Sequence, residues 1–276
     1  MKFAFLVCFE LRCSKHIDKL YKYIIDYYDA DVFICVQEED LHKINLLFNR
    51  KVKKIKVLKK VKDAKINYFQ NSELDTIGKG NFKNDPMLNF FINLIEMGKF
   101  IKKDIKNYDY FITLRTDIDI LFNFPPKKIF ESTKPSMFNF DANYCRRWGG
   151  WGSCTFAHKN FIFESLTCFD KVLRDNQLIK KYYKEKNFRV PNQETFFNYC
   201  YKIYNLNFNY IKNLNLYMTA DDFNTVSPRS KICYSKKHKT YYKYGNQLKE
   251  AHENYNLFKN NYTWKLDSNS NIYLHL

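Results

Sequence analysis

The chain has 276 residues, 45% of them hydrophobic and 18% aromatic, which is enough for one large α/β domain with a sizeable core or two small domains. The formal net charge of +17 attracts polyanions, but no arginine-rich arm or zinc-finger spacing accompanies it. No window is apolar over the roughly 18 residues that a membrane helix needs, and no Cys-x-x-Cys occurs. We therefore expect a soluble, cytoplasmic protein with reduced cysteines, without a transmembrane segment, a zinc ribbon or a thioredoxin-type site.

A strand–helix–strand pattern opens the chain. Residues 2–9 (KFAFLVCF) indicate a buried strand, residues 14–28 a helix capped by Ser14, and residues 31–36 a second strand. This order makes a βαβ unit and hence a parallel sheet. Residues 52–58 predict a third, more exposed strand, and residues 59–80 an irregular connection.

The second part of the pattern begins with Asn84-Asp85-Pro86, a strong helix start. An apolar stripe continues this helix to about Lys106, and a strand begins at Tyr110. We expect further elements as strands at 136–140 and 153–157, one or two helices at 160–184, a helix at 191–204 and a last strand at 208–216. Residues 217–276 are expected to be polar and irregular apart from a short helix at 247–258.

The most informative stretch is residues 108–122, YDYFITLRTDIDILF. Its first half is an apolar, β-branched run typical of a strand that is buried on both faces. Asp117 and Asp119 follow at the carboxyl end, where α/β proteins bind ligands. Two such carboxylates can hold a hard divalent cation, which in turn can hold a diphosphate. The alternative for an Asp-x-Asp is a solvated turn or a helix start.

On these residues the chain resembles glycosyltransferases of the GT-A fold, whose signature is an Asp-x-Asp after a hydrophobic strand. Residues 149–153 (GGWGS) are similar to the Gly/Trp loop of several such families, and Asn192-Gln193-Glu194 opens a helix that often carries an acidic residue. The resemblance implies an α/β, GT-A-like (Rossmann-related) fold with a mixed, mostly parallel sheet flanked by helices. It covers residues 1–220, with a nucleotide-sugar half at 1–122, an acceptor half at 123–220 and a C-terminal extension at 221–276.

The resemblance further implies transfer of a sugar from a nucleotide-diphosphate sugar, with a UDP-sugar favoured, to a hydroxyl acceptor such as a glycan. Mn²⁺ or Mg²⁺ suits all-oxygen ligation. By resemblance, Asp119 ligates the metal directly and Asp117 contacts the ribose or a metal-bound water. Lys99 lies on the helix before the acidic strand, where this fold often has a donor-contacting cation.

Arg12 follows the first strand at the same edge of the sheet, so it either meets the diphosphate or base or is an ordinary surface arginine. Arg115 adjoins the acidic pair and either contacts the donor or simply neutralises the pair. Gly150 and Trp151 suit a loop that approaches a sugar closely and stacks a flat apolar face on it. A tight turn with a packed tryptophan is the alternative there.

Two further roles concern the acceptor and the metal. Glu194 is our candidate for the general base that takes the proton of an acceptor hydroxyl, which implies an inverting reaction, and Asp141 is the second candidate. The helix dipole alone also favours a glutamate in a first turn. His238 and His252 are candidates for a C-terminal metal ligand.

Two other functions remain open from the sequence. A sugar-nucleotide pyrophosphorylase has a related fold, but it normally carries a glycine-rich loop after the first strand, and residues 9–14 (FELRCS) contain no glycine. A basic nucleic-acid-binding protein is suggested by the net charge of +17 and the many aromatic residues. Steep salt dependence of binding would identify such a protein.

Overall fold

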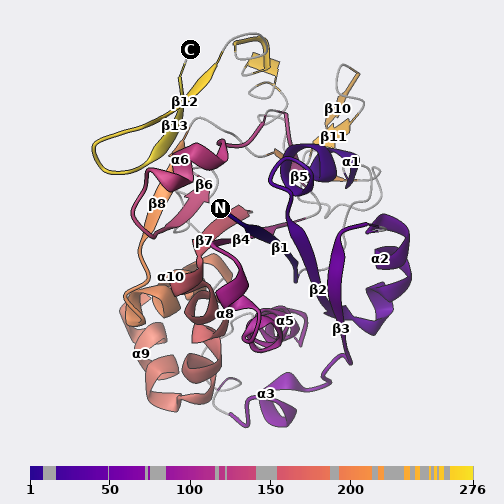
Figure 1. The fold of residues 1–276 in the computed structure, drawn as a ribbon. Helices are drawn as coiled ribbons and strands as arrows, with labels where there is room; N and C mark the ends of the chain where they lie inside the picture. The colour runs from indigo at the N-terminus through magenta and orange to yellow at the C-terminus, as the bar shows by residue number, and fades with distance from the viewer. Residues whose placement is uncertain are drawn as a thin grey trace.

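A nine-stranded sheet forms the centre of the molecule, with strand order β12-β13-β8-β6-β7-β4-β1-β2-β3 (Figure 1). The computed structural model describes residues 1–8, 17–48, 50–71, 74, 85–115, 118–121, 123–140, 154–186, 193–212, 217–220, 233–236, 240–242, 249, 252–253, 255–257 and 262–275. The strands of this sheet are β1 (Phe3–Val7), β2 (Asp31–Gln37), β3 (Val52–Leu58), β4 (Tyr110–Leu114), β6 (Met137–Phe140), β7 (Cys154–His158), β8 (Phe208–Lys212), β12 (Thr263–Leu266) and β13 (Ile272–His275).

Most neighbouring strands in this sheet run parallel. β1 pairs in parallel with β2 and β4, β2 with β3, and β8 with β6 and β13. β7 is antiparallel to β4 and β6, and β12 is antiparallel to β13. The prediction of an α/β fold with a mixed, mostly parallel sheet is therefore confirmed.

The parallel strands are apolar because both of their faces are covered. Every residue of β1 and β4 is buried, as expected for strands that lie between two helical layers. β3 is an edge strand, and its exposed Ile55 and Val57 are interspersed with Lys53, Lys54 and Lys56, which discourage pairing with another chain. The predicted third, more exposed strand at 52–58 is confirmed.

Helices cover both faces of the sheet. The helical elements are α1 (Ile17–Leu20), η1 (Tyr21–Ile25), η2 (Glu38–Asp40), α2 (Leu41–Leu47), α3 (Ala64–Asn67), α5 (Asp85–Ile101), η4 (Ile105–Asn107), α6 (Lys127–Glu131), α8 (Lys159–Arg174), α9 (Asn176–Lys186) and α10 (Gln193–Ile203). Residues of α5, α8, α9 and α10 form one apolar core, and residues of η1, α2 and α6 contribute to the other. The two cores lie on opposite faces, because successive strand residues such as Met137 and Phe138 belong to different cores.

The structure corrects three helical predictions. The single helix expected at 14–28 is, over its described residues, the short α1 followed by the π-helical turn η1, which turns Tyr21, Ile24 and Ile25 into the core. The stretch 59–80 contains α3, so it is not wholly irregular. The helix expected to reach Lys106 ends at Ile101, and the 3₁₀ turn η4 then leads into β4. The helices expected at 160–184 are two, α8 and α9.

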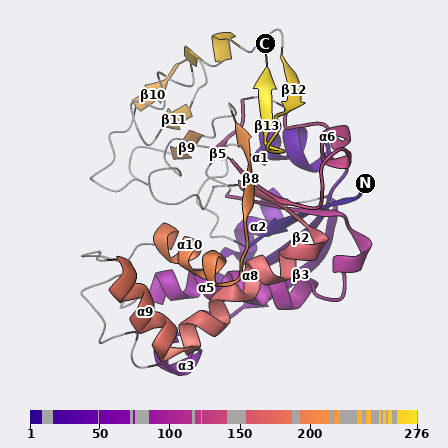
Figure 2. The same ribbon diagram turned by 90° about the vertical axis from the view of Figure 1, so that its left-hand side faces the viewer.

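The C-terminal part is more regular than its composition suggests, so the expectation of an irregular tail after residue 216 is wrong. β12 and β13 extend the central sheet beyond β8, with Ile272 and Leu274 buried in the core (Figure 2). A second, four-stranded sheet has the order β10-β11-β9-β5 and consists of β5 (Ile118–Asp119), β9 (Tyr217–Ala220), β10 (Cys233–Ser235) and β11 (Thr240–Tyr242). The division at residue 220 stays a prediction, although strands on both sides of it share both sheets.

Five cysteines are described as free thiols, and all five are buried: Cys8, Cys35, Cys154, Cys168 and Cys200. They pack as small apolar residues, in agreement with the prediction that they are reduced. Within the described ranges, no helix has the length and apolarity that crossing a bilayer requires.

Candidate functional site

The candidate site begins where β4 ends at the carboxyl edge of the parallel strands. After Leu114 the chain passes through Arg115, which is half-buried, and enters the two-residue strand β5. Of the predicted acidic pair, Asp119 lies at the predicted edge. Asp117 lies outside the described residues.

Asp119 lies in a paired strand. Its strand β5 pairs in antiparallel fashion with β9, and the neighbouring Ile118 is buried in the core beside η1. The Asp119 side chain has no solvent exposure. A carboxylate removed from water needs a compensating charge, since burying it alone is costly.

Lys19 supplies that charge. Its ammonium donates to Asp119 Oδ1 in an ion pair that joins residues 100 positions apart in sequence. Lys19 belongs to α1, the first described element after β1, and both figures show α1 beside β5. Leu20 and Tyr21 are buried directly after it, so packing fixes the backbone that carries the lysine. The Lys19 side chain is 34% exposed, so the ion pair joins a buried carboxylate to a partly exposed lysine.

Lys19 was not predicted from the sequence, in which Arg12 was the cation expected after β1. Arg12 lies outside the described residues. The signal that identifies Lys19 is its place in the first helical turn beyond the strand, at the same edge of the sheet as the acidic pair.

The chemistry of Asp119 fits the predicted divalent cation, because a carboxylate oxygen is the ligand that Mn²⁺ and Mg²⁺ prefer. One carboxylate is not a complete site, however. In the part of the chain that the structure describes, no three acidic, histidine or cysteine side chains group together to hold a metal. The other predicted ligands, Asp117 and His238, lie outside this part. Of the two candidate histidines, His252 is described, and its Nε2 lies 2.9 Å from Ser235 Oγ.

A row of polar side chains crosses the sheet one residue below this edge. Thr113 of β4 is opposite Thr155 of β7, which is opposite Asn139 of β6. All three are buried on the face covered by α5, α8 and α10, where the neighbouring positions are apolar. Within the described residues, neither Thr155 Oγ1 nor either polar atom of the Asn139 amide has a hydrogen-bond partner.

A cavity of about 10 Å³ adjoins this row, lined by Thr113 and Thr155 on the sheet side and by Ser165 and Tyr201 on the helix side. That volume corresponds to about one water molecule. The cavity is therefore a hydration site at most, and a sugar or a nucleotide does not fit it.

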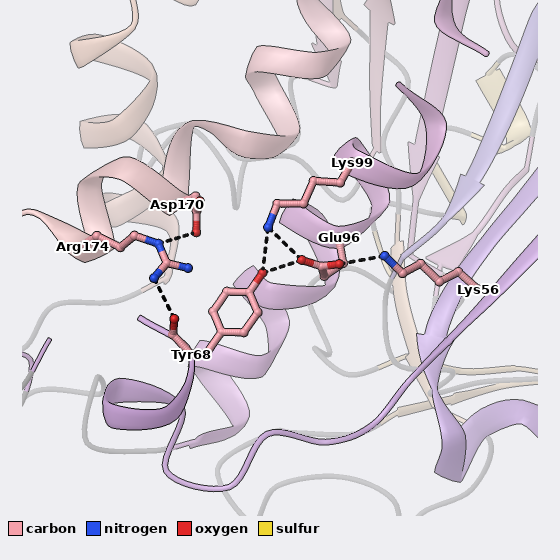
Figure 3. A network of polar contacts seen from close by, with 6 residues as sticks. All are labelled: Lys56, Tyr68, Glu96, Lys99, Asp170 and Arg174. Atoms are coloured by element: carbon pink, nitrogen blue, oxygen red, sulfur yellow. Dashed lines mark hydrogen bonds and ion pairs between the residues drawn. The ribbon is translucent and has the colours of Figure 1, made fainter. Parts of the chain in front are cut away.

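Lys99 lies in a contact network of the helical layer (Figure 3). Its ammonium donates to Glu96 Oε1 at 2.9 Å and to the Tyr68 hydroxyl at 3.3 Å, and Lys56 donates to Glu96 Oε2 at 2.7 Å. Lys99 is in the last turn of α5, which comes before the start of β4. Asp119 comes after the end of β4, so the two residues belong to opposite ends of that strand. No described contact joins Lys99 to Asp119, and its role toward a donor stays a prediction.

The other predicted residues are placed only in part. Glu194 is the second residue of α10, so the predicted helix start is confirmed, but its side chain is not described. Asp141, Gly150 and Trp151 lie outside the described residues, between β6 and β7. The structure thus places Asp119 in contact with Lys19, and it places Arg115 between β4 and β5.

No protein-family model matches this chain, and no curated protein matches it. Among solved structures, it is similar to the crystal structure of mouse xyloside xylosyltransferase 1 in its apo form. The TM-score is 0.41 and the sequence identity is 11%, with 73% of this chain and 82% of that chain covered. Similarity at this level does not bear on activity, so the function is argued from the site alone.

Proposed function

We propose that the protein is a metal-dependent glycosyltransferase that moves a sugar from a nucleotide-diphosphate sugar, with a UDP-sugar favoured, to a hydroxyl acceptor such as a glycan. The observation that supports this most is Asp119. A fully buried carboxylate directly beyond a buried parallel strand is at the edge where α/β folds bind ligands. It is also at the second acid of the Asp-x-Asp on which the resemblance to GT-A glycosyltransferases rests.

In this proposal Asp119 and Asp117 would hold a Mn²⁺ or Mg²⁺ ion, which would supply positive charge to stabilise the departing diphosphate. Asp119 suits this role because the pairing of β5 with β9 positions the backbone that carries its carboxylate. Arg12 and Arg115 are the arginines proposed for the phosphates or the base. Their guanidinium groups match phosphate oxygens in a bidentate geometry.

For the acceptor, Glu194 is the proposed general base, with Asp141 as the second candidate. A carboxylate that takes the proton of the attacking hydroxyl contributes roughly a hundred- to ten-thousand-fold in rate. Gly150 and Trp151 are proposed to let the chain approach the sugar closely and to stack on its apolar face.

A thermal-shift panel with UDP-sugars, GDP-sugars and MnCl₂ tests the donor site, since a ligand that binds only the folded state raises the melting temperature. The wild-type protein should be stabilised by a nucleotide sugar together with Mn²⁺, and Asp119→Asn should lose this response. Asp29→Asn is the matched control, because Asp29 is 82% exposed and asparagine tolerates its positive φ of 50°.

Turnover separates the roles of the two acids. Glu194→Gln should keep the Mn²⁺-dependent shift but lose most of kcat, and the product should have the anomeric configuration opposite to that of the donor. Full donor turnover by Asp119→Asn in excess EDTA would refute the proposed function.

A further inference from the structure

The ion pair between Lys19 and Asp119 has one fixed and one movable partner. The backbone of Asp119 is held in place, because β5 is paired with β9 and Ile118 is packed in the core. Lys19 has a fixed backbone but a flexible four-carbon side chain that is 34% exposed. If Lys19 is exchanged for another cation at Asp119, its side chain is the part that can move.

Two cations cannot easily share this carboxylate. The Lys19 ammonium contacts Asp119 Oδ1 directly, so a metal ion that binds through the same oxygen would have to displace it. A divalent ion and an ammonium held a few ångströms apart repel each other strongly where water is excluded. They become compatible when an anion lies between them, and a diphosphate has enough charge for this.

Resting on the function proposed above, we infer that Lys19 is an exchangeable counter-ion for Asp119. In the metal-free protein it neutralises the buried carboxylate. When a divalent cation and a nucleotide diphosphate bind together, the Lys19 side chain releases Asp119 and its ammonium turns to a phosphate oxygen. Lys19 therefore couples metal binding to nucleotide binding. The metal ion neutralises Asp119 when Lys19 leaves it, and the diphosphate neutralises the Lys19 ammonium that has moved.

The test compares wild type, Lys19→Met, Lys19→Arg and the control Lys22→Met, whose lysine is exposed in the neighbouring turn η1. Isothermal titration with MnCl₂, with and without UDP, gives the metal affinity of each protein. Urea unfolding of the metal-free proteins gives their stability.

Lys19→Met removes the competing ammonium, and the buried Asp119 carboxylate loses its ion pair with Lys19. Its metal-free form should unfold at lower urea, and it should bind Mn²⁺ at least about ten-fold more tightly than wild type without UDP. Lys19→Arg should shift the Mn²⁺ affinity in the opposite direction, since an arginine holds a carboxylate through two hydrogen bonds. In wild type UDP should raise the Mn²⁺ affinity by about ten-fold or more, within the usual range of coupling between sites, and in Lys19→Met by much less. Lys22→Met should match wild type throughout.

Equal Mn²⁺ affinity of wild type and Lys19→Met, with UDP coupling unchanged, would overturn the inference and leave the proposed function intact. If Lys19→Met does not fold, an Mn²⁺ affinity of Lys19→Arg equal to or above that of wild type overturns it. Absence of Mn²⁺ and UDP binding in every protein would overturn both the inference and the proposed function.

Discussion

Glu96 offers a quantitative test of the polar network in Figure 3. This carboxylate on α5 accepts hydrogen bonds from Lys56, Tyr68 and Lys99. Burial alone would raise the pKa of Glu96, but the three hydrogen bonds outweigh burial and lower the pKa to about 2 from an ordinary value of 4.5. Burial raises the pKa of the Tyr68 hydroxyl, and its hydrogen bond to the charged Glu96 raises it further.

The size of the effect follows from this shift. Each pKa unit corresponds to about 1.4 kcal/mol, so the full shift is equivalent to about 3 kcal/mol of folding free energy. The Lys99 side chain is 47% exposed and that of Lys56 33%, and solvent screens both pairs. We therefore expect Glu96→Gln to lower the free energy of unfolding by about 2 kcal/mol at pH 7.

The pH dependence has a definite sign. Because the folded-state pKa of Glu96 is depressed, its stabilisation is fully present above about pH 4.5, the ordinary value, and is lost as the pH falls toward about 2. The difference between wild type and Glu96→Gln should shrink across that window. Urea unfolding at pH 7, 5, 4 and 3 measures it, with Glu39→Gln as the control because Glu39 is 64% exposed in its pair with Lys60. A constant difference at every pH, or one no larger than that of the control, would refute the reasoning.

Two further predictions concern packing and buried polarity. Gly98→Ala should destabilise the protein by about 1–3 kcal/mol, because the added Cβ would lie 2.6 Å from Thr167 Cγ2 where α5 meets α8. Adding Thr167→Ser to Gly98→Ala removes that methyl group and should restore much of the urea midpoint. Asn139→Leu should leave the urea midpoint unchanged or raise it, since it removes two polar atoms that lack described partners. Asn89→Leu should instead lower the free energy of unfolding by about 1–3 kcal/mol, because the Asn89 amide hydrogen-bonds to the backbone N–H and C=O of Val61. A clear loss of stability in Asn139→Leu would show that the amide is satisfied by an ordered water.

The sequence predicts best those elements whose residues repeat a simple pattern. The uninterrupted apolar run before Arg115 identified β4 and the position of Asp119, and the stripe from Leu88 to Ile101 identified α5. β12 and β13 escaped prediction because each is only four residues long and β12 is largely exposed. Their apolar residues become core only through pairing with β8, which no local pattern reveals.

The same limit applies to the candidate site. The bond from Lys19 to Asp119 depends on how α1 packs beside β5, and this is a contact between distant parts of the chain. The row that joins Asn139 to Thr155 depends on strand register, since a shift of one residue would turn these side chains to the opposite face. Residue types alone predicted an acidic edge, while the cation that neutralises it required the fold.

The seam between β8 and β13 has a consequence for the order in which the molecule folds. The backbone N–H of Tyr210 donates to the side chain of Asn271, 61 positions later, and Ile211 pairs with Ile272. A closure of this length has a large entropic cost, so the contact is expected to form late. Until Ile272 has been synthesised, β8 is an unprotected strand edge that is open to pairing with another chain. Chaperone dependence and aggregation during synthesis should therefore centre on this flank, while the β1–β4 half can form earlier.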